Sequence, residues 1–206
     1  MTEISETGYW DADVAPEEHC HIESLAQWLI SYLKDDKDTP IYDFGCGFGY
    51  YLNELQKAGF TNLTGFEGAP PVNKLFDNIV AQDLTKPFTV PVKGTCIFLE
   101  VAEHIPAKFE KVVLDNITNA CGTKIIMSWA LRGQSGTGHV NCLDNHEVIA
   151  RMAGRGFRYL EQDSLAARRI DLGTGWCWFR NTILIFERSP IISPIIYTQL
   201  DTKDTV

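Results

Sequence analysis

The sequence predicts a single α/β domain built on a doubly wound, mostly parallel seven-stranded sheet. Seven short segments of β-type composition alternate along the chain with stretches of helical periodicity. A glycine-rich turn follows the first of these segments and leads directly into a helix. Such alternation implies parallel pairing with right-handed crossovers. A strand, glycine turn and helix in that order is typical of a nucleotide-cofactor site.

The predicted elements begin with an amphipathic helix over residues 17–34, in which Leu25, Leu29 and Leu33 recur at helical spacing. Strands are expected over residues 40–44, 63–67, 79–82, 95–99, 123–128, 157–161 and 181–187, with helices mostly between them. We therefore divide the domain into an N-terminal lid and helix segment over residues 1–38, a core over residues 39–188 and a C-terminal arm over residues 189–206.

The turn after the first strand reads Asp43-Phe44-Gly45-Cys46-Gly47-Phe48-Gly49. Its glycines permit positive φ angles and let a ligand lie against bare peptide groups. We expect all three to serve a ligand, because packing alone does not call for three. The following helix should end at Gly59, which suits a C-cap.

An acidic residue, Glu67, closes the second predicted strand. An acid about 20 residues beyond the first glycine can accept hydrogen bonds from the ribose of a bound nucleoside, and Glu67 falls close to that spacing. The alternative is a solvated acid at a strand end. The glycine turn upstream favours the ribose clamp.

Dinucleotide dehydrogenases carry Gly-x-Gly-x-x-Gly, whose third glycine would fall at Tyr50. The turn instead resembles motif I of the class I S-adenosylmethionine-dependent methyltransferases. Later segments resemble the same family, namely Glu67, Gln82-Asp83-Leu84 and the stretch from Leu99 to Pro106. Within that stretch, Glu100-Val101-Ala102-Glu103-His104 resembles the Glu-Val-x-Glu-His signature of small-molecule methyltransferases.

The resemblance implies a Rossmann-like fold with residues 181–187 as an inserted antiparallel strand, and S-adenosyl-L-methionine as cofactor. Asp43 would orient the turn and the amino-acid end of the cofactor, Glu67 would hold the ribose, and Asp83 would accept from the adenine amino group. Asp83 could instead be an N-cap before Leu84 and Thr85. The full set of expected cofactor-binding residues is Asp43, Gly45, Cys46, Gly47, Gly49, Glu67, Gly68, Asp83, Leu84 and Glu100.

The chemistry of this cofactor agrees with the sequence. S-adenosylmethionine has no phosphate, and the chain has no lysine-bearing phosphate loop. Its carboxylate would be favoured by free N–H groups of the turn and by the helix N-terminus.

The acceptor side offers two histidines as catalytic candidates. His104 follows the fourth predicted strand, at the edge where ligands bind in such sheets, and could act as a base or make a structural hydrogen bond. His139 stands in a glycine-rich loop after the fifth strand, of a kind that closes over acceptors. Asn141 and Asp144 could simply cap the helix that starts near Asn145. The expected substrate-binding residues are Tyr9, Trp10, Trp129, Arg132 and Asn141.

Composition excludes several classes of partner. A net charge of −9 argues against binding to a nucleic-acid backbone. No apolar run approaches the roughly 20 residues that span a bilayer, and the acidic start lacks the features of a secretory signal, so we expect a cytoplasmic protein without membrane contact. The 6 cysteines are scattered, and His19-Cys20-His21 alone is weak support for zinc, so we expect no metal.

The sequence thus predicts methyl transfer to a small-molecule acceptor. A cofactor-binding scaffold without catalysis, or modification of a protein partner, remains an alternative. Prolines and paired isoleucines in the C-terminal arm exclude a central strand and favour packing on the body or in a homodimer.

Overall fold

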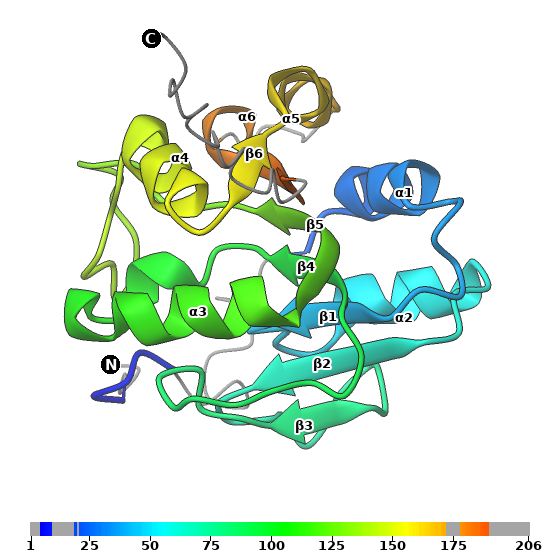
Figure 1. Cartoon of the computed structure of the whole chain (residues 1–206). Coiled ribbons are helices and arrows are strands. Elements are labelled where there is room, and N and C mark those ends of the chain that lie inside the picture. The colour runs from blue at the N-terminus through cyan, green and yellow to red at the C-terminus, as the bar shows by residue number, and fades with distance from the viewer. Residues whose placement is uncertain (1–4, 10–18, 20, 172–177, 190–206) are drawn as a thin grey trace, which may run out of the picture.

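The computed structural model describes residues 5–9, 19, 21–171 and 178–189 (Figure 1). Trp10, Cys20 and the predicted arm from residue 190 onward lie outside these described residues, so the lid role of Trp10 and the homodimer remain predictions.

The strands of the structure form one sheet of seven in the order β3-β2-β1-β4-β5-β7-β6. Strand β7 runs antiparallel to both of its neighbours, and the other pairings are parallel. The predicted fold class is therefore confirmed. The strands are β1 (Ile41–Phe44), β2 (Leu63–Glu67), β3 (Ile79–Ala81), β4 (Gly94–Phe98), β5 (Cys121–Met127), β6 (Phe157–Tyr159) and β7 (Leu184–Arg188).

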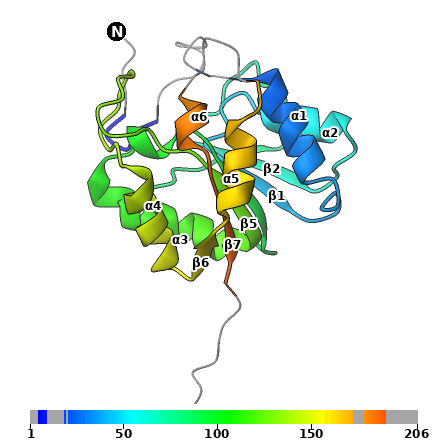
Figure 2. The same cartoon turned by 90° about the horizontal axis from the view of Figure 1, so that it is seen from above.

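Helices cover both faces of the sheet, as Figure 2 shows from above. The α-helices are α1 (Glu23–Tyr32), α2 (Tyr50–Lys57), α3 (Glu110–Ala120), α4 (Asn145–Ala153), α5 (Glu161–Arg168) and α6 (Phe179–Thr182), and two short 3₁₀ turns are η2 (Ala102–His104) and η3 (Ala107–Phe109). Helices α3 and α4 share one apolar core, while α1, α2, α5 and α6 share the other. Among the described residues, no helix has the length and apolar character needed to cross a bilayer.

Side chains alternate between these two cores along each central strand. In β5, Ile125 and Met127 belong to the core under α3 and α4, while Ile126 belongs to the opposite core. Successive side chains of a strand point to opposite faces, so a buried strand must be apolar on both. This explains why the buried end of β5 carries apolar residues at consecutive positions.

Several element boundaries differ from those predicted, and the starts of α1 and β7 differ most. Helix α1 begins at Glu23, because Ile22 has an extended backbone, with φ −128° and ψ 116°. Strand β7 begins at Leu184 because the residues before it close the short helix α6, in which the Thr182 hydroxyl donates to the Trp178 carbonyl at 3.2 Å.

Strand β7 is tied to helix α5 by a buried serine. The Ser164 hydroxyl donates to the Leu160 carbonyl at 2.7 Å and accepts from the Ile185 N–H at 2.9 Å. The Leu160 N–H in turn donates to the Ile185 carbonyl at 2.8 Å. These bonds fix the inserted strand against the helix layer.

Candidate functional site

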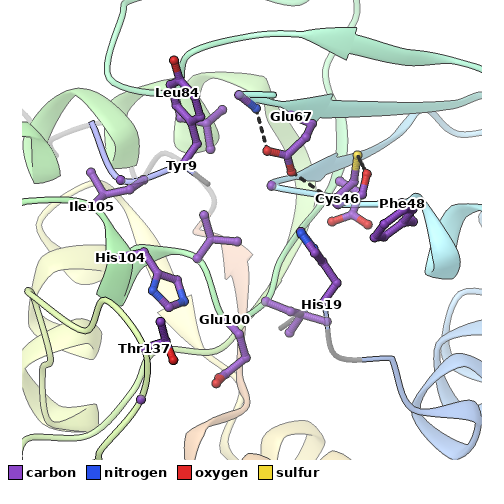
Figure 3. Close-up of a pocket in the computed structure, with 18 of the residues that line it drawn as sticks. Tyr9, His19, Cys46, Phe48, Glu67, Leu84, Glu100, His104, Ile105 and Thr137 are labelled. Atoms are coloured by element: carbon purple, nitrogen blue, oxygen red, sulfur yellow. Dashed lines mark hydrogen bonds between the residues drawn. The ribbon is translucent and has the colours of Figure 1, made fainter. Parts of the chain in front are cut away.

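A cavity of about 450 Å³ lies at the carboxyl edge of β1, β2 and β4. Asp43 from β1, Glu67 from β2 and Glu100 after β4 line it. Residues 7–9, His19 and residues 134–137 approach from other parts of the chain. Ligands of open α/β sheets bind at this edge. The structure therefore places the predicted cofactor and acceptor groups around one space (Figure 3).

The glycine turn forms one wall of the cavity and has the backbone expected of it. Gly45, Gly47 and Gly49 have φ angles of 74°, 52° and 78°. The amides of Gly45 and Cys46 donate to the Phe66 carbonyl at 2.7 and 3.2 Å, and that of Gly47 donates to Glu67 Oε2 at 2.9 Å. The turn thus satisfies several of its own N–H groups within the protein, which differs from the expectation of free amides.

The three glycines also have packing roles, which the sequence did not indicate. A Cβ at Gly45 would lie 2.5 Å from a methyl of Val101, and one at Gly47 would lie 2.4 Å from His19 Nδ1. A Cβ at Gly49 would lie 2.7 Å from the Phe76 Cβ, and Gly49 is outside the cavity lining. The expectation that all three serve a ligand is therefore corrected for Gly49, which allows Phe76 to pack against the start of α2.

Two buried acids lie beneath this turn. Glu67 accepts from the amides of Gly47 and Gly68, at 2.9 and 2.7 Å (dashed in Figure 3). Burial raises the pKa of Glu67, and the backbone N–H groups oppose this shift. Burial, followed by the nearby charge of Glu67, raises the pKa of Asp43 from 3.8 to about 8. The pair therefore favours a cation, because one charge nearby would stabilise both ionised carboxylates.

Asp83 has the capping role considered for it and also lies at the cavity. Its Oδ1 accepts from the N–H and the hydroxyl of Thr85, at 2.8 and 2.6 Å, so it caps the turn that follows β3. Asp83 and the largely buried Leu84 also line the cavity. On the same side, Tyr9 packs over Gly68, where an added Cβ would lie 2.6 Å from the Tyr9 Cβ.

The segment after β4 carries two close acids. Glu100 is the single non-glycine residue with positive φ (54°) in the part of the chain that the structure describes. Ser128 holds it there, because its hydroxyl accepts from the Glu100 N–H and donates to Glu100 Oε1, both at 2.8 Å. Such backbone strain clusters at functional sites.

Glu103, in η2, is fully buried, and its carboxyl lies beside the Glu100 carboxyl and the Ala130 N–H. Burial raises the pKa of Glu103 well above its usual range, and the nearby carboxyl of Glu100 raises it further. Two carboxyl groups so close in a buried place favour a cation nearby.

The two histidines lie next to each other at the same edge. The ring centroids of His104 and His139 are 5.1 Å apart, and both rings line the cavity. Burial, then the charge of His139, lowers the pKa of His104 to about 4, so this imidazole is neutral near pH 7. His139 Nδ1 lies 3.2 Å from the Gln134 carbonyl, and because a carbonyl can only accept, this nitrogen carries the proton.

The structure does not bring three of the predicted substrate residues to this cavity. Trp129 is 1% exposed in the core, and its indole N–H donates to the Asn141 carbonyl at 2.5 Å. Arg132 forms two hydrogen bonds with Glu147, both at 2.7 Å. Asn141 donates its N–H to the Glu103 carbonyl at 3.0 Å. Trp129 and Asn141 instead hold the loop that carries His139 through these hydrogen bonds. The Trp129 side chain lies at a strand end, where a side chain can turn toward the core rather than toward the cavity.

Other residues of the cavity were not among the predicted site residues. His19 and His21 belong to the segment predicted as an N-terminal lid, and both line the cavity. The sequence left Trp178 as either an aromatic wall beside the acceptor or a residue packed in a hairpin, and it lines the cavity, whereas residues 172–177 lie outside the described part of the chain. Phe179, in the short helix α6, lines the cavity too and is far in sequence from every motif, so no local signal indicated it.

Comparison with known proteins gives a shared fold and a short sequence match. No protein-family model matches the chain. A stretch of 59 residues is 34% identical to human (Homo sapiens) EEF1A lysine methyltransferase 2 and covers 29% of the chain. The chain spans only 25% of the length of that relative.

Solved structures with the same fold are mostly methyltransferases. Magnesium protoporphyrin IX methyltransferase from Synechocystis PCC 6803, with bound SAM, has a TM-score of 0.58 at 17% identity, over 80% of this chain and 78% of that one. The Burkholderia thailandensis 1,6-didemethyltoxoflavin-N1-methyltransferase has a TM-score of 0.63 at 11% identity, over 86% and 82%. The [4+2]-cyclase SpnF has a TM-score of 0.57 at 13% identity, over 80% of each chain. The chain therefore has the Rossmann-like methyltransferase fold.

Proposed function

We propose that this chain is an S-adenosyl-L-methionine-dependent methyltransferase with a small-molecule acceptor. The observation that carries the proposal is the cavity at the carboxyl edge of the sheet. The glycine turn, Glu67 and Asp83 line one part of it, and His104 and His139 line another. Bound SAM in the magnesium protoporphyrin IX methyltransferase supports the choice of cofactor, as does SAH in the 1,6-didemethyltoxoflavin-N1-methyltransferase.

The first part of the cavity suits the cofactor. The residues of the turn would contact its amino-acid end, whose ammonium group would favour the ionised forms of Asp43 and Glu67. Glu67 accepts from the three amides of Gly47, Gly68 and Ala69, yet a carboxylate offers about four acceptor positions, so it can also receive a ribose hydroxyl. Both hydrogen bonds from Thr85 to the Asp83 side chain use Oδ1, which leaves Oδ2 for the adenine amino group.

The second part suits the acceptor. Methyl transfer is a displacement in which the acceptor atom attacks the methyl group in line with the departing sulfur, so the protein must align the acceptor and exclude water. His104 and His139 would face the acceptor, and a neutral imidazole can take up its proton. The segment at residues 7–9 and the loop at residues 134–139 would cover the cavity on these sides.

A protein acceptor is the second candidate. The 59-residue match to EEF1A lysine methyltransferase 2 favours it. The fold alone does not decide between the two acceptors, because one fold supports different activities, as the [4+2]-cyclase SpnF shows.

Calorimetry with S-adenosylmethionine and S-adenosylhomocysteine tests the cofactor site. We expect both to bind the wild type, and Glu67→Gln to weaken binding at least about tenfold, because charge-assisted hydrogen bonds to the ribose are lost. Glu161→Gln, at an exposed position that opens α5, is the matched control and should leave affinity unchanged. A wild-type chain that binds neither compound would contradict the proposal.

The acceptor class is tested with S-adenosylmethionine that carries a labelled methyl group. After incubation with cell extract, label in the small-molecule fraction supports the proposed acceptor. Label recovered mainly on lysine side chains of protein would favour the second candidate instead.

A further inference from the structure

We infer that Glu103, His104 and His139 form a binding site for a divalent transition-metal ion at the edge of the cavity. Each residue offers one ligand atom, and these atoms all lie within 4.8 Å of one another. Metal–ligand distances are about 2.1 Å, so two ligand atoms of one ion lie at most about 4.2 Å apart. Small side-chain rotations would bring the three atoms within that limit.

The buried carboxyl of Glu103 is the second observation that points to a cation. This side chain is fully buried, and its ligand atom lies within 4.8 Å of those of the two imidazoles. Its neighbours include the Glu100 carboxyl and the Ala130 N–H. Two carboxyl groups so close in a buried place are costly to ionise unless a cation lies nearby. A divalent ion between Glu103 and the histidines would supply that positive charge.

The backbone holds the three residues together before any ion binds. The N–H groups of Val140 and Asn141 both donate to the Glu103 carbonyl, at 2.8 and 3.0 Å. These two hydrogen bonds to one carbonyl oxygen fix the loop of His139 against η2, which carries Glu103 and His104. The indole of Trp129 secures the same loop through the Asn141 carbonyl at 2.5 Å.

The tautomer of His139 also suits a metal. Because Nδ1 donates to the Gln134 carbonyl, the neutral ring leaves Nε2 as the atom with a free lone pair. A metal-binding histidine commonly donates its other nitrogen to a carbonyl in this way. Gly136 packs against Nε2, and a Cβ there would lie only 2.3 Å from it, so the loop provides room for this ring position.

The donor set selects the kind of ion. Two imidazoles with one carboxylate favour first-row transition ions such as manganese, cobalt or zinc over calcium, which takes oxygen ligands. Both histidines line the cavity, so open coordination positions would face it. If the proposed function holds, an oxygen of the acceptor could occupy one of them. The ion, in place of an imidazole whose lone pair it has taken up, would then promote loss of the acceptor proton by lowering the pKa of a hydroxyl there.

The sequence led us to expect no metal, because His19-Cys20-His21 was the cluster of potential metal ligands that it offered. Glu103 and His104 belong to a segment that was assigned to the cofactor and acceptor. His139 is far from them in sequence, so their meeting could be seen only in the folded chain.

Equilibrium binding of Mn²⁺ to the full, tag-free chain, followed by the paramagnetic signal of the free ion, tests this site. We expect one saturable site per chain, and Glu103→Gln and His139→Ala should each weaken Mn²⁺ binding at least about tenfold. The exposed Glu161→Gln and His146→Ala are matched controls that should bind like the wild type. Absence of saturable binding, or equal binding by all variants, would overturn the inference.

Two further measurements separate folding and function from metal binding. Co²⁺ should give visible absorption bands of a nitrogen- and oxygen-bound ion, and these should disappear in His139→Ala while its unfolding temperature without metal stays close to that of the wild type. Bands that persist in a folded His139→Ala would count against the site. The Mn²⁺ measurement needs no cofactor, so the two sites are tested independently. A chain that binds S-adenosylhomocysteine but no Mn²⁺ would refute only the metal site. A chain that binds Mn²⁺ but no S-adenosylhomocysteine would refute only the cofactor site.

Discussion

The buried carboxyl of Asp43 should make the stability of the folded chain depend on pH. Its pKa rises from 3.8 to about 8, first because of burial and then because of Glu67. Between these pH values the unfolded chain has released the proton while the folded chain keeps it. The folded state therefore loses stability as pH rises through this window, with a slope of up to about 1.4 kcal/mol per pH unit.

Asp43→Asn should remove most of this dependence. We expect the free energy of unfolding, measured in urea, to fall less between about pH 5 and pH 8 in the variant than in the wild type. Asp38→Asn, at an exposed position, should behave like the wild type. Parallel pH profiles for wild type and Asp43→Asn would show that this carboxyl is ionised in both states.

Single residues were predictable where a motif fixes the backbone and less so where side-chain direction decides. Gly45, Asp43 and Glu67 were placed correctly at the cavity, because the turn and the strand ends fix their positions. Trp129 was expected to face a substrate, yet its indole is buried and bonds to the loop. Residues at a strand end can turn to the core or to the cavity, and the sequence around Trp129 does not distinguish the two.

At the scale of elements, the hydrogen bonds between α5 and β7 attach the inserted strand to the helix layer, and their contribution to stability can be measured. Ser164→Ala removes the acceptor of the Ile185 N–H, which lies in the buried interior. We expect a loss of about 1–3 kcal/mol in the free energy of unfolding, because that donor would remain buried without a partner.

Urea unfolding of Ser164→Ala beside Thr61→Ala, at an exposed position, provides the measurement and its control. Equal stability of the two variants would mean that the serine hydroxyl contributes nothing to the attachment of β7.

The sequence placed every strand of the sheet but not every boundary. Buried central strands such as β5 are apolar on both faces, so their signal is strong. Asn181 and Thr182 directly precede the apolar run and were expected in the strand, yet they close helix α6. Short apolar segments do not distinguish a helical turn from a strand end, so that boundary depends on tertiary contacts.

For the whole molecule, ligand binding should appear as a gain in overall stability. S-adenosylhomocysteine at about 100 times its dissociation constant should add about 2.7 kcal/mol, because it binds the folded chain alone. For a domain of this size that corresponds to a rise of about 5–10 °C in the unfolding temperature. Thermal unfolding with and without the compound measures the shift.

Glu67→Gln at the same concentration should show a smaller rise. An unchanged unfolding temperature of the wild type at saturating S-adenosylhomocysteine would contradict the cofactor assignment.

The sheet of the whole molecule was predictable because periodicity and strand order leave few alternatives, whereas the composition of the cavity was not. The cavity joins residues 7–9, His19, the turn at residues 45–49 and the loop at residues 134–139. These segments meet only because the crossovers of the sheet bring their ends to one edge. Local patterns carry no information about such a meeting.

Glu103 performs two separable tasks, because its carbonyl anchors the loop through Val140 and Asn141 while its side chain faces the histidines. A peptide carbonyl is common to all amino acids, so a change of one nucleotide from a glutamate to a glutamine codon would remove the carboxyl group and keep the anchor. Metal binding at this position could therefore change during evolution while the loop stays attached to η2. In related genes, residue 103 is the first position to compare when their metal binding differs.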